Sequence, residues 1–139
     1  MSNKANKGSF RIISGKYKGR KFEFLPSSDL RPTPDRLRET LFNWLQREVK
    51  GARCLELYAG SGILSLEALS RGADQVTLVE KSKQTHQHLM STFRTLPCDN
   101  FEVISGTAAK FLETAYSTYD IVFIDPPFNS GEIEKILPQ

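Results

Sequence analysis

The segment Asp125-Pro126-Pro127-Phe128 places a carboxylate, two prolines and an aromatic ring directly after the apolar run Ile121–Ile124. Prolines lack a backbone N–H and hold φ at about −65°, so this strand end presents acceptors, the Asp125 carboxylate and the Pro126 carbonyl, without competing donors. Acceptors that bind both protons of an exocyclic amine aim its nitrogen lone pair at an electrophile. Phe128 offers a face on which a base can stack. The segment therefore predicts a site for a flat base that carries an amino group.

The same four residues also fit a strand that simply ends in a Pro-Pro turn, because a residue before proline is usually extended. The segment alone does not separate these two interpretations. Residues elsewhere in the chain favour the base site, since they predict a cofactor site at the same edge of the same sheet.

A glycine-containing loop follows an earlier predicted strand, in the run Leu55-Glu56-Leu57-Tyr58-Ala59-Gly60-Ser61-Gly62. Gly60 and Gly62 permit a tight turn and close approach of a ligand to the backbone. A dinucleotide-binding fingerprint would have a third glycine where this chain has Ser65, so the match is partial. Glu56 would repel a pyrophosphate but could accept hydrogen bonds from an ammonium group. The loop therefore favours a cofactor with an amino-acid end over one with phosphates.

Glu80 closes the next predicted strand, twenty residues after Gly60, where doubly wound folds place an acid on ribose hydroxyls. Taken singly, Glu56 and Glu80 also fit ordinary charges at strand ends. Their shared position at the carboxyl ends of neighbouring strands favours a site for an adenosine cofactor. The stretch Gly106-Thr107-Ala108 follows the third strand and fits either a cofactor contact or an N-capped helix start.

The amino-terminal part predicts a hairpin and one helix. Residues 10–14 and 20–25 are β-prone, and the cationic stretch 15–19 between them is typical of a hairpin turn. After an extended link, Thr33 is the expected N-cap and Pro34 the first residue of a helix that extends to residue 49. Its apolar stripe consists of Leu37, Leu41, Trp44 and Leu45. Its polar face carries Arg36, Arg38 and Glu39.

The rest of the chain alternates between strand and helix patterns. The strands are predicted at residues 53–57, 76–80, 101–104 and 119–125. Helices are predicted at residues 63–71, 82–96 and 108–115, and another begins at residue 131. This alternation predicts an α/β fold, a Rossmann-like doubly wound parallel sheet with right-handed crossovers, preceded by an N-terminal β-hairpin.

Composition indicates one globular domain's worth of chain, with 139 residues, 39% hydrophobic and 25% charged. The polar start and the lack of a long apolar run predict a cytoplasmic protein without membrane association. Cys54 and Cys98 lack metal-ligand spacing, and His86 and His88 would face different directions on a helix. We therefore expect no metal.

Charge is unevenly distributed along the chain. Residues 1–21 hold seven of the nineteen basic residues and no acid, whereas residues 22–139 hold twelve basic and sixteen acidic residues. A basic arm on an acidic body indicates a polyanion partner, although residues 1–8 also fit a solvated tail.

These motifs together resemble class I S-adenosylmethionine-dependent methyltransferases, and more closely the RsmD family, which methylates the N2 amine of one guanine in 16S ribosomal RNA. The family-like segments are residues 11–15, 19–21, 31–45 and 66–73. The Arg31-Pro32-Thr33 part of these segments is absent from generic methyltransferases. The resemblance covers roughly residues 10–130.

The resemblance implies roles for three groups of residues. The S-adenosyl-L-methionine cofactor would contact Glu56, Tyr58, Ala59, Gly60, Ser61, Gly62, Glu80, Gly106, Thr107 and Ala108. The target amine and base would contact the catalytic residues Asp125, Pro126, Pro127 and Phe128. The RNA-binding residues would be Arg11, Lys16, Lys18, Arg20, Arg31, Thr33, Arg36 and Arg38. The implied partner is ribosomal RNA in a small subunit or an assembly intermediate.

In this family the fold continues with a further helix and further strands after the segment equivalent to residues 125–128. We therefore expect residues 1–50 to form the basic arm, hairpin and leading helix, and residues 51–139 to form an incomplete methyltransferase core. Its last strand would be an exposed apolar edge, as in a truncated gene product or fragment. A complete fold would be monomeric.

Three alternative functions remain compatible with the residues. An adenine-N6 methyltransferase of DNA or RNA would use the same amine-binding segment. An RNA-binding fragment without catalysis would keep only the basic hairpin. A nicotinamide-dependent dehydrogenase is disfavoured by Ser65 and Glu56.

Overall fold

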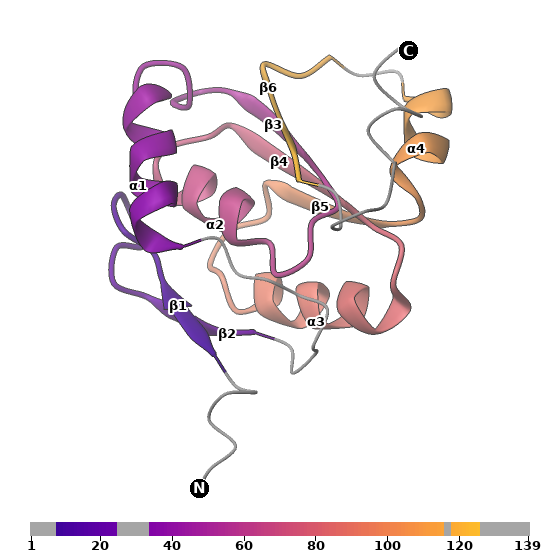
Figure 1. The fold of residues 1–139 in the computed structure, drawn as a ribbon, viewed down its shortest axis with the longest axis horizontal. Helices are drawn as coiled ribbons and strands as arrows, with labels where there is room; N and C mark the ends of the chain where they lie inside the picture. The colour runs from indigo at the N-terminus through magenta and orange to yellow at the C-terminus, as the bar shows by residue number, and fades with distance from the viewer. Residues whose placement is uncertain (1–7, 25–33, 116–117, 126–139) are drawn as a thin grey trace, which may run out of the picture.

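The computed structural model describes residues 8–24, 34–115 and 118–125. Figure 1 shows them as a small two-stranded sheet beside a larger sheet that is flanked by helices. The larger sheet is parallel, and its strand order is β5-β4-β3-β6. Its strands are β3 (Arg53–Leu57), β4 (Gln75–Glu80), β5 (Phe101–Ser105) and β6 (Ile121–Ile124). The predicted Rossmann-like α/β arrangement is confirmed.

Three helices connect the parallel strands. The helices are α2 (Ile63–Ser70), α3 (Lys83–Arg94) and α4 (Ala108–Thr114). Strands β3, β4 and β5 follow one another in one direction across the sheet, and β6 then returns to the other side of β3. Right-handed crossovers therefore place α2 and α3 on one face and α4 on the other, as Figure 1 shows. The reversal makes the carboxyl ends of β3 and β6 the point where such folds bind ligands.

The central strand β3 contributes alternate residues to two hydrophobic clusters. Cys54 packs on the side of α2 and α3, whereas Leu55 and Leu57 pack on the side of α4. Because side chains alternate along a strand, Glu56 faces the same side as Cys54. The sequence thus directs an acidic side chain toward α2 from a strand in which residues 54–57 are buried.

The predicted hairpin is present, with shorter strands than expected. Strand β1 (Ser9–Arg11) pairs antiparallel with β2 (Lys21–Glu23), and Phe10 lies opposite Phe22. The Phe10 and Phe22 ring centroids are 5.7 Å apart. Both rings belong to the cluster that covers the α2 side of the large sheet, so the hairpin shares a core with the sheet.

Helix α1 spans Asp35–Trp44 and begins one residue later than predicted. Pro34 is its N-cap, with φ −58° and ψ 145°, instead of its first helical residue. A proline cap offers no side-chain acceptor, and no side chain among the described residues caps this helix with a hydrogen bond. The predicted cap, Thr33, lies outside the described residues.

The buried face of α1 also differs from the prediction. Leu37 and Trp44, two members of the predicted apolar stripe, are 59% and 77% exposed. Arg38 and Phe42 are buried instead. Phe42 packs on Phe123 of β6, with ring centroids 5.8 Å apart. The helix is thus turned so that Phe42 meets the sheet.

Strand β6 is the edge of the large sheet among the described residues, where it pairs only with β3. Val122 and Ile124 of this strand are 45% and 38% exposed. This matches the expected apolar edge. In the same described portion of the chain, no helix has both the length and the apolar character that a membrane span requires.

Candidate active site at the carboxyl ends of the strands

Glu56, near the end of β3, is 4% exposed and lies against the first turn of α2. Its Oε1 accepts hydrogen bonds from the Ser65 backbone N–H at 3.1 Å and from the Ser65 hydroxyl at 2.7 Å. Burial raises the pKa of Glu56 to about 8, against the lowering effect of the Ser65 hydrogen bonds. The nearby charges of Asp125 and Glu80 raise this pKa further. Glu56 is therefore poised to ionise when a cation arrives.

The loop after β3 has a backbone that few residues adopt. Tyr58 has φ 59°, an unusual value for a non-glycine residue, and Gly60 has φ 57°. The Ala59 N–H donates to the carbonyl of Val79 on the neighbouring strand at 3.1 Å. Strained residues of this kind persist where their surroundings hold them and are common at ligand sites. The loop is thus fixed above the ends of β3 and β4.

Glu80, the last residue of β4, joins this loop to the start of α3. Its Oε1 accepts from the Gly60 N–H at 3.0 Å, and its Oε2 accepts from the Ser82 N–H at 3.0 Å. Ser82 is the N-cap of α3 and accepts from the Thr85 N–H. The acid expected to bind a ribose therefore also shapes the glycine loop.

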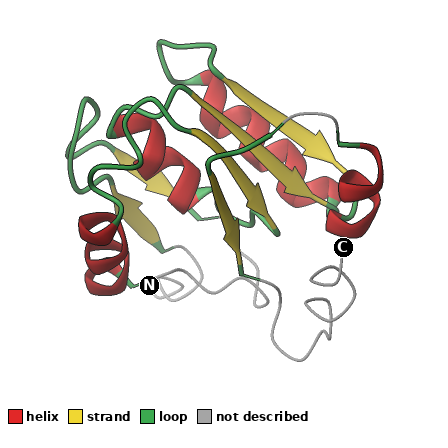
Figure 2. Ribbon diagram, turned by 90° about the horizontal axis from the view of Figure 1, so that it is seen from above, coloured by secondary structure: helices red, strands yellow, loops and turns green. Residues whose placement is uncertain are grey.

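The third loop, which follows β5, is hydrogen-bonded to Glu80. The Gly106 N–H donates to the Glu80 carbonyl at 3.0 Å. Thr107 caps α4 by accepting from the Lys110 N–H at 3.1 Å, and Ala108 is buried beneath it. The helix-start interpretation of these residues is confirmed, and the backbone of Gly106 lies beside Glu80. Figure 2 shows the parallel strands whose carboxyl ends carry these loops.

Gly62 serves the packing of the core. Its φ is 75°, and a Cβ built there would lie 2.8 Å from Leu89 Cδ2 and 3.2 Å from both Leu78 Cδ2 and Phe93 Cε1. The hydrogen that replaces a side chain therefore points toward α3 and the sheet. Gly62 therefore lets the start of α2 pack closely against α3 and β4. A glycine in the loop of nucleotide-binding folds likewise permits close packing of a helix on a strand.

Asp125 directly follows β6 and is exposed. Leu57 of β3 is paired with Ile124 of β6, so Asp125 begins beside the end of β3. Asp125 lies close enough to Glu56 for its charge to contribute to the raised pKa of that group. Pro126, Pro127 and Phe128 lie outside the described residues.

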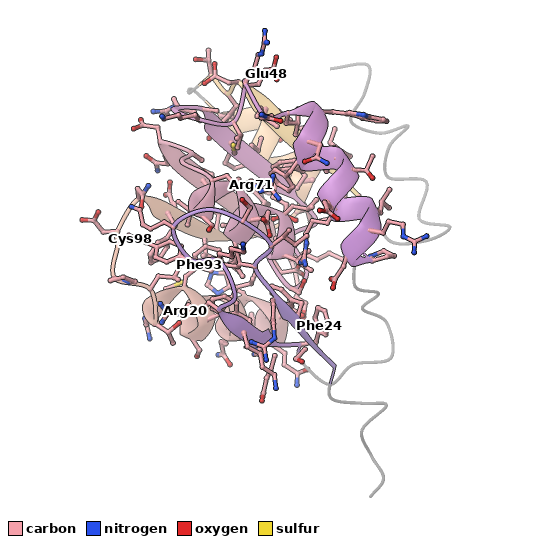
Figure 3. All side chains as sticks on the ribbon, turned by 90° about the vertical axis from the view of Figure 1, so that its left-hand side faces the viewer. Arg20, Phe24, Glu48, Arg71, Phe93 and Cys98 are labelled. Atoms are coloured by element: carbon pink, nitrogen blue, oxygen red, sulfur yellow. The ribbon has the colours of Figure 1, made fainter. Side chains whose placement is uncertain are left out.

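Several of the proposed RNA-contacting cations lie on the hairpin surface. Arg11, Lys16 and Lys18 are exposed. The Arg11 guanidinium donates to the Gly19 carbonyl at 2.9 Å. Arg20 donates to the carbonyl of Thr95, just after α3, at 2.7 Å. Arg20 is labelled in Figure 3. The hairpin turn is therefore a fixed cationic surface.

Arg38 departs from its expected position. The sequence places it on the polar face of α1 for contact with RNA, whereas the structure leaves its side chain 1% exposed. Its guanidinium donates to the Arg11 carbonyl at 2.8 Å and to Asp35 at 3.0 Å. Arg38 is thus an internal cation that supports the fold. Arg36 of the same helix is exposed, and Arg31 lies outside the described residues, as does Thr33.

Sequence reasoning missed the residues that attach the hairpin to the core. Glu67 and Ser70 of α2 bond the backbone of residues 13–17. One signal was available: Glu67 is the only charged residue within α2, whose residues are all buried. A charge in that setting is expected to have specific partners.

Comparison with known proteins gives consistent matches. The sequence model of the family described as conserved hypothetical protein 95 matches residues 10–139. The chain is 44% identical over 135 residues to ribosomal RNA small subunit methyltransferase D of Escherichia coli K12, a match that covers 97% of this chain and 68% of that protein. It is 43% identical to the Haemophilus influenzae protein of the same name, covering 94% and 70% of the two chains.

Solved structures of other proteins share the fold of this chain. The structure of yhhF from Escherichia coli, described as a candidate methyltransferase, superposes with a TM-score of 0.83 at 42% identity, covering 94% of this chain and 71% of that chain. A hypothetical protein from Thermus thermophilus superposes with a TM-score of 0.80 at 28% identity, covering 93% and 77%. The strands and helices described above therefore have counterparts in experimentally solved proteins.

Proposed function

The chain belongs to the conserved hypothetical protein 95 family, the RsmD family of methyltransferases, and from this premise we propose that it methylates the N2 amine of a guanine in small-subunit ribosomal RNA, with S-adenosylmethionine as the methyl donor. Relatives named as small-subunit ribosomal RNA methyltransferases support the RNA substrate. The guanine N2 position rests on the family resemblance and on the acceptor group at the end of β6.

The observation that carries this proposal is the hydrogen bonding around Glu80. One carboxylate and its own backbone carbonyl hold the Gly60 loop, the start of α3 and the Gly106 loop at a single edge of the sheet. Glu56 lies buried at the same edge. Preorganised loops at a topological switch point are what a nucleoside cofactor requires.

The residues fit the chemical groups of S-adenosylmethionine, which would supply a methyl group made electrophilic by a sulfonium. Ionised Glu56 would accept hydrogen bonds from the ammonium group, directly or through water. The Glu80 carboxylate has about four lone-pair positions, and the N–H groups of Gly60 and Ser82 use two of them. The remaining positions are available to ribose hydroxyls.

At the target base, the Asp125 carboxylate would accept a hydrogen bond from an N–H of the guanine amine. This bond would orient the lone pair of the amine nitrogen. Asp125 acts in this proposal as an acceptor more than as a strong base, because positioning is the main need of an in-line transfer. The amine nitrogen would form a bond to the methyl carbon as the bond from that carbon to the sulfonium sulfur breaks, and the amine proton would pass to water during or after attack. Pro126 would supply the second acceptor, and Phe128 would supply the stacking surface.

The direct test is methyl transfer by the full chain to a small-subunit ribosomal RNA transcript and to assembled small subunits. The cofactor would carry a labelled methyl group, and the RNA would be digested to nucleosides after reaction. We expect label in N2-methylguanosine. Label in N6-methyladenosine would favour the adenine alternative, and RNA binding without transfer would favour a binding fragment. Calorimetry with S-adenosylmethionine and with NAD would separate a methyltransferase from a dehydrogenase.

A further inference from the structure

Helix α2 connects the two functional ends of the molecule. Its first turn holds Glu56 through Ser65, and its last turns hold the hairpin through Glu67 and Ser70. All of its residues are buried, so it has little room to shift. The cofactor edge and the cationic turn are thus attached to one short rigid element.

Glu67 accepts hydrogen bonds from the backbone just before the hairpin turn. Its Oε1 accepts from the Ile13 N–H at 3.0 Å, and its Oε2 accepts from the Ser14 N–H at 3.1 Å. The same Oε2 accepts from Arg71 Nε at 2.8 Å, and the Glu67 side chain has no exposure. A carboxylate buried without such partners would cost free energy. The two backbone bonds attach the hairpin to Glu67, and the bond to Arg71 balances the charge of the carboxylate.

Ser70 forms hydrogen bonds with the backbone of the turn itself. Its hydroxyl accepts from the Tyr17 N–H at 2.8 Å and donates to the Ser14 carbonyl at 2.7 Å, and its backbone carbonyl accepts from the Lys16 N–H at 2.7 Å. Between these contacts, a Cβ on Gly15 would lie 2.1 Å from the Ser70 carbonyl oxygen. The turn therefore rests directly on the end of α2, and only glycine permits it.

Arg38 closes the arrangement from the side of α1. Its Nη2 donates to the Arg11 carbonyl at 2.8 Å, and its Nε lies 3.8 Å from Glu67 Oε1, which is an ion-pair distance and too long for a hydrogen bond. Arg71, labelled in Figure 3, supplies a second cation to Glu67. The hairpin is thus held by charged groups from two helices.

We propose that Glu67, Ser70 and Gly15 form a latch that positions the cationic turn relative to the cofactor edge, so that its lysines meet RNA phosphates while the target base lies at Asp125. This inference rests on the proposed function. The three residues are positioning residues, because none of them would touch the RNA or the cofactor. They act by holding Lys16 and Lys18 in place.

Two glycines of the same turn provide a matched test. Gly15 and Gly19 have similar φ angles, 96° and 85°, so alanine strains the backbone at both. Only Gly15→Ala also drives a Cβ into Ser70, because no atom of the described residues lies within 4 Å of a Cβ at Gly19. The pair therefore separates release of the latch from general strain in the turn.

The measurements are affinity for a small-subunit ribosomal RNA transcript over a range of salt concentrations, and affinity for S-adenosylmethionine. We expect Gly15→Ala to weaken RNA binding by about tenfold or more and to flatten its salt dependence, because each phosphate contact to a single strand contributes a slope of about −0.7. Gly19→Ala should remain close to the unmodified protein. Cofactor affinity should be unchanged in both variants.

Ser70→Ala supplies a second variant, which removes the bonds to Tyr17 and Ser14 without adding bulk. We expect it to weaken RNA binding in the same direction and to speed amide hydrogen exchange at Tyr17. Equal RNA binding by Gly15→Ala and Gly19→Ala would overturn the latch, as would a joint loss of RNA and cofactor binding in Gly15→Ala. Failure of the unmodified protein to bind RNA would instead contradict the proposed function and the latch with it.

Discussion

Ser65 donates its backbone N–H and its hydroxyl to the same oxygen of Glu56, at 3.1 and 2.7 Å. In the sequence these residues are two separate departures from a dinucleotide-binding fingerprint. In the structure they are one interaction, which joins the end of β3 to the first turn of α2. A third glycine at position 65 would lack the hydroxyl that holds the acid in place. The loop is therefore built around an acidic side chain.

The stability of the protein should depend on pH through Glu56. Burial raises the pKa of this group from 4.5 to about 8, so the folded protein keeps a proton that the unfolded chain releases. The free energy of unfolding should therefore fall as pH rises from about 4.5 to about 8. Glu56→Gln removes the titration and should flatten this part of the curve, as urea denaturation at several pH values would show. An identical slope in both proteins would contradict the assignment.

Glu80 should control cofactor affinity through the shape of the loops as well as by contact. Glu80→Gln replaces one acceptor oxygen by an amide donor, so either Gly60 or Ser82 loses its hydrogen bond. Loss of a charged hydrogen bond is worth about 1.5–3 kcal/mol, so we expect S-adenosylmethionine affinity to fall roughly tenfold to a hundredfold. Calorimetry measures this directly. Glu102→Gln, an exposed acid on β5, is the control and should leave affinity unchanged.

The parallel sheet was predictable because each strand and helix carries its own local pattern. Strand β3 has the bounds that were predicted, and Glu56 and Glu80 were placed at one edge from their positions at strand ends. The hydrogen bond between Gly60 and Glu80 could not be predicted, because it depends on the backbone path of a strained loop.

The orientation of α1 was not predictable for a different reason. Two helical stripes compete in this segment, one through Leu37 and Trp44 and one through Arg38 and Phe42. Hydrophobicity alone selects the first. The structure buries the second, where Arg38 lies 3.8 Å from Glu67 and Phe42 packs on Phe123. Such partners lie far away in sequence.

Gly62 should affect the stability of the fold, because its neighbours lie in the core. Gly62 and Gly51 have nearly the same φ, 75° and 78°. A Cβ at Gly62 would lie 2.8 Å from Leu89, whereas one at Gly51 would have no atom within 4 Å in the part of the chain that the structure describes. We expect Gly62→Ala to lower the free energy of unfolding by roughly 1–3 kcal/mol more than Gly51→Ala, the usual cost of overpacking a core. Denaturant unfolding of both variants checks this. Equal losses would show that the core yields freely at Gly62.

Asp125 should act on the chemical step and not on cofactor binding. It is exposed at the end of β6, and only the amine of the target base is proposed to use it as an acceptor. We expect Asp125→Ala to lower the turnover number by about a hundredfold or more, the size of positioning and acid–base effects, while S-adenosylmethionine affinity stays nearly constant. The control is Asp99→Ala, an exposed acid before β5 at the opposite edge of the sheet, which should transfer methyl groups at the unmodified rate. Single-turnover transfer with saturating cofactor separates the chemical step from binding. Full activity in Asp125→Ala would remove this carboxylate from the mechanism and leave amine orientation to the residues that follow it.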